Sequence, residues 1–308
     1  MTPDLSISRA VRFATLFAAF VLAGCAPQAS APAPAPAASA GKTLATACAG
    51  RNGWSDPAPP AKIFGNTYYV GTCGITVLLI DAPGGLVLID GATEAATPSI
   101  LANIRALGFD PKDVHTLLAT HEHDDHVGGL AALQQATGAR IYARREAAAA
   151  LSSGHPDAAD PQRGIASPFK GVAIADTVGD SDVLPIGDLD LTAHATPGHT
   201  PGSTSWTWRS CEGRDCRAIA YVDSVTALTD GTYRFSENPA YVATFRATLN
   251  KVAAFPCDIL ISPHPPASNL FARLSGEAPL VDTNACRAYA EGAAKRLDDL
   301  LAKEKAAR

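Results

Sequence analysis

The chain has 308 residues, of which 47% are hydrophobic and 18% are charged, as in a globular protein with a sizeable core. Its formal net charge of -5 offers no basic surface for a nucleic acid or an anionic membrane. We therefore expect no nucleic-acid partner. No protein partner is indicated either, so we expect a monomer.

Residues 1–25 are predicted to be a signal peptide. Arg9 and Arg12 precede the apolar run FATLFAAFVLAG, which is too short to cross a bilayer. The run ends in LAGC, which resembles a bacterial lipobox, so Cys25 would carry lipid and tether the protein to the outer membrane. Ordinary cleavage a few residues later, within ASA, is the alternative. Either route predicts export to the periplasm.

Residues 26–41 are rich in alanine and proline, carry no charge, and are expected to form an extended spacer. A single folded domain should then occupy residues 42–308, since no second linker follows.

The seven cysteines fit an exported protein. If Cys25 carries lipid, six remain, and an oxidising compartment allows three disulfides. We expect neighbours along the chain to pair, as Cys48–Cys73, Cys211–Cys216 and Cys257–Cys286. A cysteine-rich metal site is disfavoured because the chain has no Cys-x-x-Cys pair.

Strands and helices alternate from Phe64 onward. TVLLI and GLVLID flank the turn former APGG and predict a hairpin. Thr97 is the expected N-cap of a helix that has Pro98 in its first turn and ends near Gly108. VHTLLAT then reads as a buried strand, and a further helix is expected over VGGLAALQQATG.

The second half continues the pattern. Strands are expected at GVAIADTV, LDLTAHAT, STSWTW, AIAYVD and DILISP, and helices at residues 239–255 and 282–305.

The stretch ATHEHDDHVGGL, residues 119–130, lies between a predicted strand and a predicted helix, where open α/β sheets bind ligands. His121 and His123 are two apart on an extended segment and can hold one metal ion together. Asp125 and His126 can turn toward a second ion. A zincin helix is excluded because it requires His-Glu-x-x-His, and position 125 is aspartate. The remaining ligands must come from distant loops.

THEHDDHVGG resembles the signature of the metallo-β-lactamase fold superfamily. The resemblance implies an α/β fold, a four-layer αββα sandwich with mixed sheets and helices on both outer faces. Its metal pair would lie at one edge of the sheets. The superfamily includes lactamases, thioesterases, lactonases and nucleases, so the signature specifies the metal better than the substrate.

Three further stretches are similar to class B metallo-β-lactamases of the third subclass: HATPGHTPGSTSW, ISPHPP and WSDPAPPAKIFGNTYYVGT. The resemblance implies two Zn²⁺ ions per chain. The first would be held by His121, His123 and His199, and the second by Asp125, His126 and His264.

The stretch AYVDSVTA distinguishes substrate classes. Thioesterases of the glyoxalase II type use an aspartate here to bridge two metals, and the third lactamase subclass has a serine that binds substrate. Neighbours on a strand face opposite sides, so either Asp223 or Ser224 would face the metals. We favour Ser224, with Thr226, as the substrate-binding pair.

The predicted reaction is hydrolysis of the β-lactam amide bond by a hydroxide shared between two zinc ions, with Asp125 as the residue that orients it. This would inactivate β-lactam antibiotics in the periplasm and make the protein a resistance enzyme. One alternative is a thioester or lactone hydrolase of the same fold. A non-catalytic periplasmic zinc-binding lipoprotein is another, although a structural zinc site normally leaves no open position.

Overall fold

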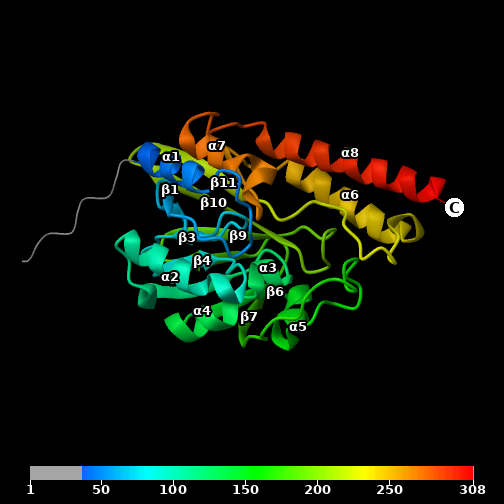
Figure 1. Cartoon of the computed structure of the whole chain (residues 1–308), viewed down its shortest axis with the longest axis horizontal. Helices are drawn as coiled ribbons and strands as arrows, with labels where there is room; N and C mark the ends of the chain where they lie inside the picture. The colour runs from blue at the N-terminus through cyan, green and yellow to red at the C-terminus, as the bar shows by residue number, and fades with distance from the viewer. Residues whose placement is uncertain (1–36, 308) are drawn as a thin grey trace, which may run out of the picture. The chain divides into compact units, whose positions relative to one another are not determined.

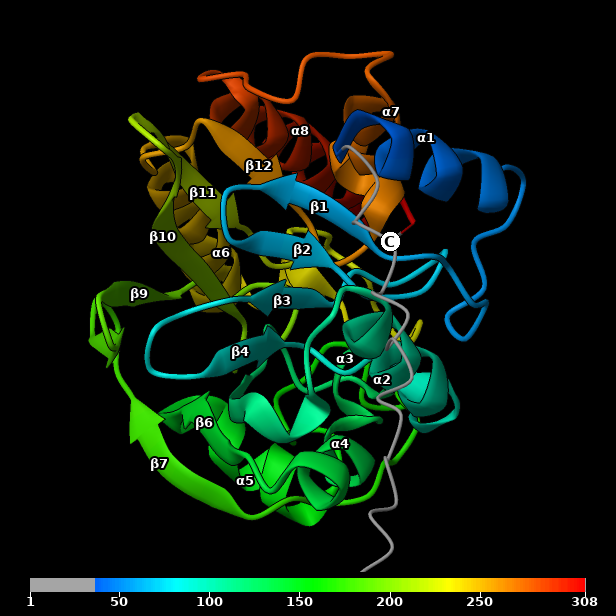
Figure 2. The same ribbon diagram turned by 90° about the vertical axis from the view of Figure 1, so that its left-hand side faces the viewer.

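Two mixed β-sheets lie face to face in this protein, and helices cover the outer face of each sheet (Figure 1, Figure 2). The structure is a computed structural model that describes residues 37–307. The layers follow the order helix, sheet, sheet, helix, and the predicted αββα fold class is confirmed.

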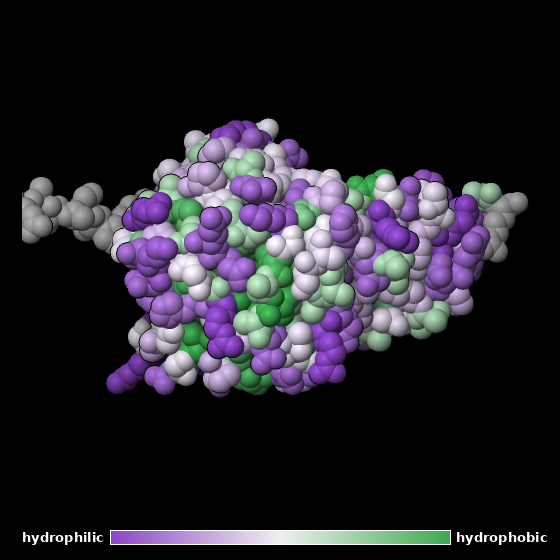
Figure 3. All heavy atoms as spheres, turned by 90° about the horizontal axis from the view of Figure 1, so that it is seen from below, coloured by the Kyte–Doolittle hydropathy of each residue, from purple (hydrophilic) through white to green (hydrophobic). Residues whose placement is uncertain are grey.

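The first sheet has the strand order β1-β2-β3-β4-β5-β6-β7. Its strands are β1 (Ala61–Phe64), β2 (Thr67–Tyr69), β3 (Leu78–Ile80), β4 (Leu86–Ile89), β5 (Val114–Leu118), β6 (Arg140–Arg144) and β7 (Ile174–Val178). Its outer face carries α2 (Thr97–Ala106), α3 (Asp124–Val127), α4 (Leu130–Thr137) and α5 (Arg145–Ser153). Figure 3 shows the side of the molecule on which α4 and α5 lie, where hydrophilic side chains surround small hydrophobic patches.

The second sheet has the strand order β12-β11-β10-β9-β8. Its strands are β8 (Val183–Ile186), β9 (Leu189–Ala195), β10 (Thr204–Glu212), β11 (Asp215–Tyr221) and β12 (Ile259–Ile261). Helices α6 (Pro239–Ala253) and α8 (Ala285–Ala306) pack against each other over its outer face. The short α7 (Leu270–Ser275) packs against α1 (Ala37–Ala47). Four 3₁₀ turns of the described residues are η1 (Glu94–Ala96), η2 (Pro111–Asp113), η3 (Phe235–Glu237) and η4 (Pro265–Ser268).

Strand β4 is buried on both of its faces. Val87 and Ile89 point into the core between the two sheets, where they join Trp206 of β10. Leu86 and Leu88 point the other way, into the core between the first sheet and its helices. A strand covered on both sides is apolar throughout, which explains the continuous run in GLVLID.

Most of the elements expected from Phe64 onward are confirmed. The strands β3 and β4 form the predicted antiparallel hairpin, and β5 and α6 lie where the apolar spacing predicts them. Thr97 is the first helical residue of α2 and not its N-cap, because α2 continues directly from the turn η1.

The folded region starts earlier than predicted. Helix α1 begins at Ala37, so the last residues of the predicted linker, 37–41, are helical, and this corrects the expected domain start at Lys42. The sequence AASAGKTLATA is rich in alanine, which has the highest helix propensity. Leu44 is fully buried in the core, and α1 packs against β1 and α7.

The expected signal peptide and Cys25 lie outside the described residues. Within residues 37–307, no helix combines the length and the apolar character needed to span a membrane.

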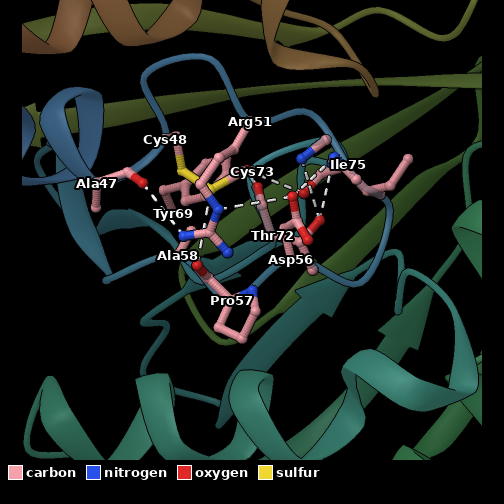
Figure 4. The surroundings of a disulfide bond; sticks show 12 residues. Ala47, Cys48, Arg51, Asp56, Pro57, Ala58, Tyr69, Thr72, Cys73 and Ile75 are labelled. Carbon is pink, nitrogen blue, oxygen red and sulfur yellow. Dashed lines mark hydrogen bonds and ion pairs between the residues drawn. A yellow bond between two sulfur atoms is a disulfide. The ribbon is translucent and has the colours of Figure 1, made fainter.

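Disulfides join the same three cysteine pairs that the sequence led us to expect. The bond between Cys48 and Cys73 connects the end of α1 to the loop after β2 (Figure 4). Beside it, the N–H group of Cys73 donates to the carbonyl of Asp56 at 2.9 Å, and the Tyr69 hydroxyl donates to the carbonyl of Ile75 at 3.0 Å. These two segments also supply Asn52, Trp54 and Gly74 to the wall of a cavity of about 480 Å³.

Replacing both Cys48 and Cys73 by serine should lower the free energy of unfolding by about 3 kcal/mol, because the bond closes a loop with a sequence separation of 25. The Cys211–Cys216 pair is the matched control, since its separation of only 5 predicts a smaller loss. Urea unfolding at neutral pH measures both. Equal midpoints for the wild type and the first variant would contradict this expectation.

Candidate metal centre

The histidine loop, residues 119–129, begins at the C-terminal end of β5, the edge where α/β sheets bind ligands. Asp90, at the end of β4, holds its start. The backbone N–H group of Thr120 donates to one carboxylate oxygen of Asp90 at 2.7 Å, and the Thr120 hydroxyl donates to the other at 2.9 Å. Asp90 is fully buried, so this anchor is shielded from water.

His121, His123 and His199 form the first group of candidate ligands, and their ligand atoms all lie within 4.8 Å of one another. All three are buried. The ring nitrogens on their other sides have partners: His121 Nδ1 with Asp223 Oδ1 at 2.8 Å, His123 Nε2 with Asp160 Oδ2 at 2.8 Å, and His199 Nδ1 with the carbonyl of Thr226 at 2.9 Å. Metal-binding histidines are oriented in this way, with one nitrogen held and the other left for the metal.

Asp125, His126 and His264 form the second group. The distance from Asp125 Oδ2 is 3.2 Å to His126 Nε2 and 3.5 Å to His264 Nε2, and the two nitrogens are 3.4 Å apart. Tetrahedral zinc with bonds of about 2.1 Å places its donor atoms about 3.4 Å apart. The three donor atoms therefore fit a zinc ion.

Burial keeps most of these imidazoles neutral. It lowers the pKa of His199 to about 4 and holds the pKa of His121 well below its usual value, with the neighbouring histidines adding to both effects. Burial also lowers the pKa of His264. A metal ligand must be a neutral imidazole, so the fold prepares these groups for a cation.

Asp125 and His126 form a charged pair within the same cluster. Burial alone would lower the pKa of His126, but the carboxylates of Asp125 and Asp90 outweigh it and raise the pKa to about 10. Burial alone would raise the pKa of Asp125, but the His126 ring beside it outweighs this and lowers that pKa. Asp125 is therefore an anion at neutral pH, as a ligand of a cation must be, and a metal ion that binds His126 would displace the proton of that ring.

The adjacent residues Asp223 and Ser224 have different surroundings. Ser224 and Thr226 line a cavity of about 480 Å³ together with His123, Asp125, His199 and His264. The carboxylate of Asp223 is fully buried and bonds to the far nitrogen of His121. Of the two neighbours, Ser224 is the one that lines the cavity.

The segment between α5 and β7 supplies two polar groups that the motifs do not identify. Asp160 bonds to His123, and its other carboxylate oxygen accepts the N–H of Gln162 at 2.7 Å. The Gln162 amide nitrogen lies 3.3 Å from His199 Nε2. Their only signal in the sequence is the length of the polar stretch that contains them, since long loops in compact domains are often functional.

Asp230 connects this segment to the loop after β11. Its N–H group donates to the carbonyl of Pro161 at 2.9 Å, and its carboxylate accepts the N–H of Gly164 at 3.1 Å. The N–H group of Tyr233 and both donors of Thr232 also bond to this carboxylate and lower its pKa to about 2. The carboxylate thus fastens two loops that both border the cavity.

Of the other polar residues in the motifs, Glu122 and His194 have structural contacts. Glu122 is buried and accepts hydrogen bonds from the Thr200 hydroxyl and the N–H of Gly202, both at 2.9 Å. This brings the loop of His199 against the histidine loop. His194 bonds to Thr207 at 2.8 Å and packs on a phenylalanine ring away from the cavity.

The fold and the two donor groups are those of a metal-dependent hydrolase with an αββα sandwich. The family model of the Metallo-beta-lactamase superfamily matches residues 70–212. The structure is similar to the metallo-beta-lactamase MIM-1 from Novosphingobium pentaromativorans, with 51% identity and a TM-score of 0.84 over 86% of this chain and 98% of that one. BJP-1, a subclass B3 metallo-beta-lactamase of Bradyrhizobium japonicum, is 34% identical with a TM-score of 0.73, over 82% of this chain and 97% of that one.

The chain belongs to the metallo-beta-lactamase superfamily, among the enzymes of subclass B3. Among curated proteins, it is 35% identical over 166 residues to a hydroxyacylglutathione hydrolase of Anaeromyxobacter dehalogenans, over 54% of this chain and 51% of that protein. The chain thus spans about half the length of the first curated relatives it matches.

Replacing Asp160 by asparagine should weaken zinc binding by about 10- to 100-fold, because His123 would lose the carboxylate that orients it. Competition with a chromophoric chelator measures the dissociation constant. Asp157→Asn is the matched control, since Asp157 lies in the same segment, is partly exposed, and its carboxylate accepts only the local N–H of Ala159 among the described residues. An unchanged zinc affinity in the Asp160 variant would remove it from the set of positioning residues.

Replacing Asp230 by alanine should free the Gly164 amide and loosen the loop that carries Asp160 and Gln162. Hydrogen exchange followed by mass spectrometry should show faster exchange confined to the two fastened loops. Asp282→Ala is the control, because Asp282 makes a similar local turn contact, to the N–H of Asn284, outside those loops. If exchange near Gly164 matches the wild type, Asp230 does not fasten the loops.

Proposed function

We propose that this protein hydrolyses the amide bond of β-lactams with two zinc ions. His121, His123 and His199 would hold one ion, and Asp125, His126 and His264 the other. The observation that carries the proposal is that the hydroxyl-bearing residues Ser224 and Thr226 line the cavity of these ligands, while the carboxylate of Asp223 is committed to His121.

These residues would hold zinc, which when bound would polarise a carbonyl group and lower the pKa of water toward neutrality. The protein's own groups prepare the reaction. Oδ2 of Asp125 faces His126 and His264. The second oxygen of this carboxylate would be the acceptor that orients the attacking water. The partners of His121 and His123 hold both rings fixed, so their nitrogens need no reorganisation during the reaction.

Two kinds of side chain in the cavity suit a β-lactam. The hydroxyls of Ser224 and Thr226 would donate hydrogen bonds to the carboxylate on the fused ring. Apolar side chains stand at the mouth: Trp54, Ile165 and Leu228 are 52%, 62% and 53% exposed, and all three line the cavity. Exposed apolar groups around a polar centre favour a ligand with apolar substituents.

A second candidate is hydrolysis of a glutathione thioester, which the names of the curated relatives suggest. It needs a carboxylate that bridges two metals. Asp223 is the nearest such group in the AYVDSVTA segment, and its bond to His121 leaves it a positioning role. The β-lactam proposal therefore has the stronger support.

We also propose export to the periplasm, where the substrate would meet the enzyme. The three disulfides support an oxidising compartment. Lipidation of Cys25 would add a tether to the outer membrane, and globomycin, which blocks lipoprotein processing, would reveal it as a change in precursor size.

The first test is hydrolysis of nitrocefin and of a carbapenem by the purified domain, before and after EDTA and after zinc is restored. We expect EDTA to abolish turnover, zinc to return it, and metal analysis to find two zinc ions per chain. S-lactoylglutathione should be turned over poorly. Efficient cleavage of the thioester by zinc-loaded protein that leaves both lactams intact would favour the second candidate.

Replacing Asp125 by alanine should lower kcat for nitrocefin by ~100-fold or more, because it removes both a ligand and the acceptor for the attacking water. Circular dichroism should show an unchanged fold. Asp113→Ala, at an exposed position of turn η2, is the control and should keep full turnover. A fully active Asp125 variant would rule out the mechanism.

A further inference from the structure

We propose that the cavity between α8 and the η4–α7 segment is a subsite for an anionic arm of the substrate. The proposal rests on the function proposed above and names a class of substrate for it: β-lactams whose ring carboxylate is flanked by an arm that ends in a sulfonate or carboxylate.

The cavity is large and borders the metal cavity. Its volume is about 850 Å³, against about 480 Å³ for the cavity at the metal ligands. The two have four lining residues in common: Thr226, Pro266, Ala267 and Tyr289. The two cavities therefore adjoin at these residues, and in the proposed subsite a molecule bound at the metals extends past them into the second cavity.

The hollow exists because one face of α8 carries small residues. Ala285, Ala288 and Gly292 line it, at the spacing of successive helical turns. Glycine is the least favourable helix residue after proline, so Gly292 in the middle of a 22-residue helix needs an explanation. Its missing side chain leaves open space, with Arg296 Nη1 3.4 Å from the position that a Cβ would occupy.

Arg296 is the available charge in this cavity. Among residues 37–307, its guanidinium has no hydrogen-bond or ion-pair partner. The second arginine of the lining, Arg273, donates to the backbone carbonyls of Leu260 and Pro279. The one acidic lining residue, Asp282, accepts the N–H of Asn284. The lining therefore carries an excess positive charge that a ligand anion would neutralise.

Thr226 indicates which part of a substrate reaches this subsite. It lines both cavities, and its hydroxyl is proposed to bind the ring carboxylate. The substituent next to that carboxylate then lies toward Arg296. In cephalosporins this substituent is the arm on C3, so an acid at the end of that arm should bind the guanidinium.

Two cephalosporins test the proposal because they share one acyl side chain and differ at the C3 arm. Cefonicid carries a sulfonate on the methyl group of the tetrazole, and cefamandole does not. Replacing Arg296 by glutamine should raise the ratio of KM for cefonicid to KM for cefamandole about fivefold, as expected for the loss of a partly exposed ion pair. Gly292→Leu should raise the same ratio without a change of charge, by filling the hollow.

Arg287→Gln is the matched control, because it removes an exposed positive charge from the opposite side of α8, at about 3.6 residues per turn. The ratio should stay at the wild-type value in this variant. An unchanged ratio in both the Arg296 and Gly292 variants would overturn the subsite.

A protein that hydrolyses neither cephalosporin would instead contradict the proposed function. In that case, the ratio of the two dissociation constants of the zinc-loaded protein, measured by calorimetry, replaces the KM ratio. The subsite then stands if the Arg296 and Gly292 variants raise this ratio and falls if neither does.

Discussion

The buried carboxylate of Asp90 is the interaction on which the rest of the site depends. It accepts the backbone N–H and the hydroxyl of Thr120 from the first sheet, and the Tyr221 hydroxyl from the second sheet at 2.7 Å. It also lies 3.6 Å from Nδ1 of His126. One group thus fixes the start of the histidine loop relative to both sheets. Leaving one of these buried donors without the Asp90 carboxylate would lower the free energy of unfolding by about 1–3 kcal/mol, so the contacts are strongly favoured as a set.

From this fixed point, the candidate ligands are oriented by partners that are distant in the sequence. His121 is held by a residue that follows β11, and His123 by one in the segment before β7. His264 donates its Nδ1–H to the carbonyl of Gly74 at 3.2 Å, in the loop that the Cys48–Cys73 disulfide fastens. No short peptide could supply these contacts. The site therefore exists only when both sheets have paired, which makes metal affinity a consequence of the whole fold.

The parts that the sequence predicts are those with a local signal. Strict apolar spacing predicts the β3–β4 hairpin and α6, and the density of histidine and aspartate predicts the first ligands. Strand β6 and helix α5 are not predicted from the sequence. Charged residues flank the short apolar alternation in RIYAR, and the buried face of α5 consists largely of alanine, so its two faces differ little in hydropathy. The roles of Asp160 and Asp230 are not predicted, for another reason. Their roles are contacts between loops, and a polar loop residue has no pattern that reveals its partner.

The adjacent residues Asp223 and Ser224 show why the candidate metal ligands alone do not identify the substrate. Both are buried polar residues beside the same cluster, and a sequence can only place them next to each other. In the structure, Oδ1 of Asp223 lies 2.8 Å from Nδ1 of His121, the ring nitrogen that faces away from the cluster. Turning that carboxylate into the cavity would cost His121 its orienting partner. The fold therefore gives the acid a positioning contact and leaves a neutral hydroxyl at the cavity wall, where the anionic group of the proposed substrate would meet a donor instead of a like charge.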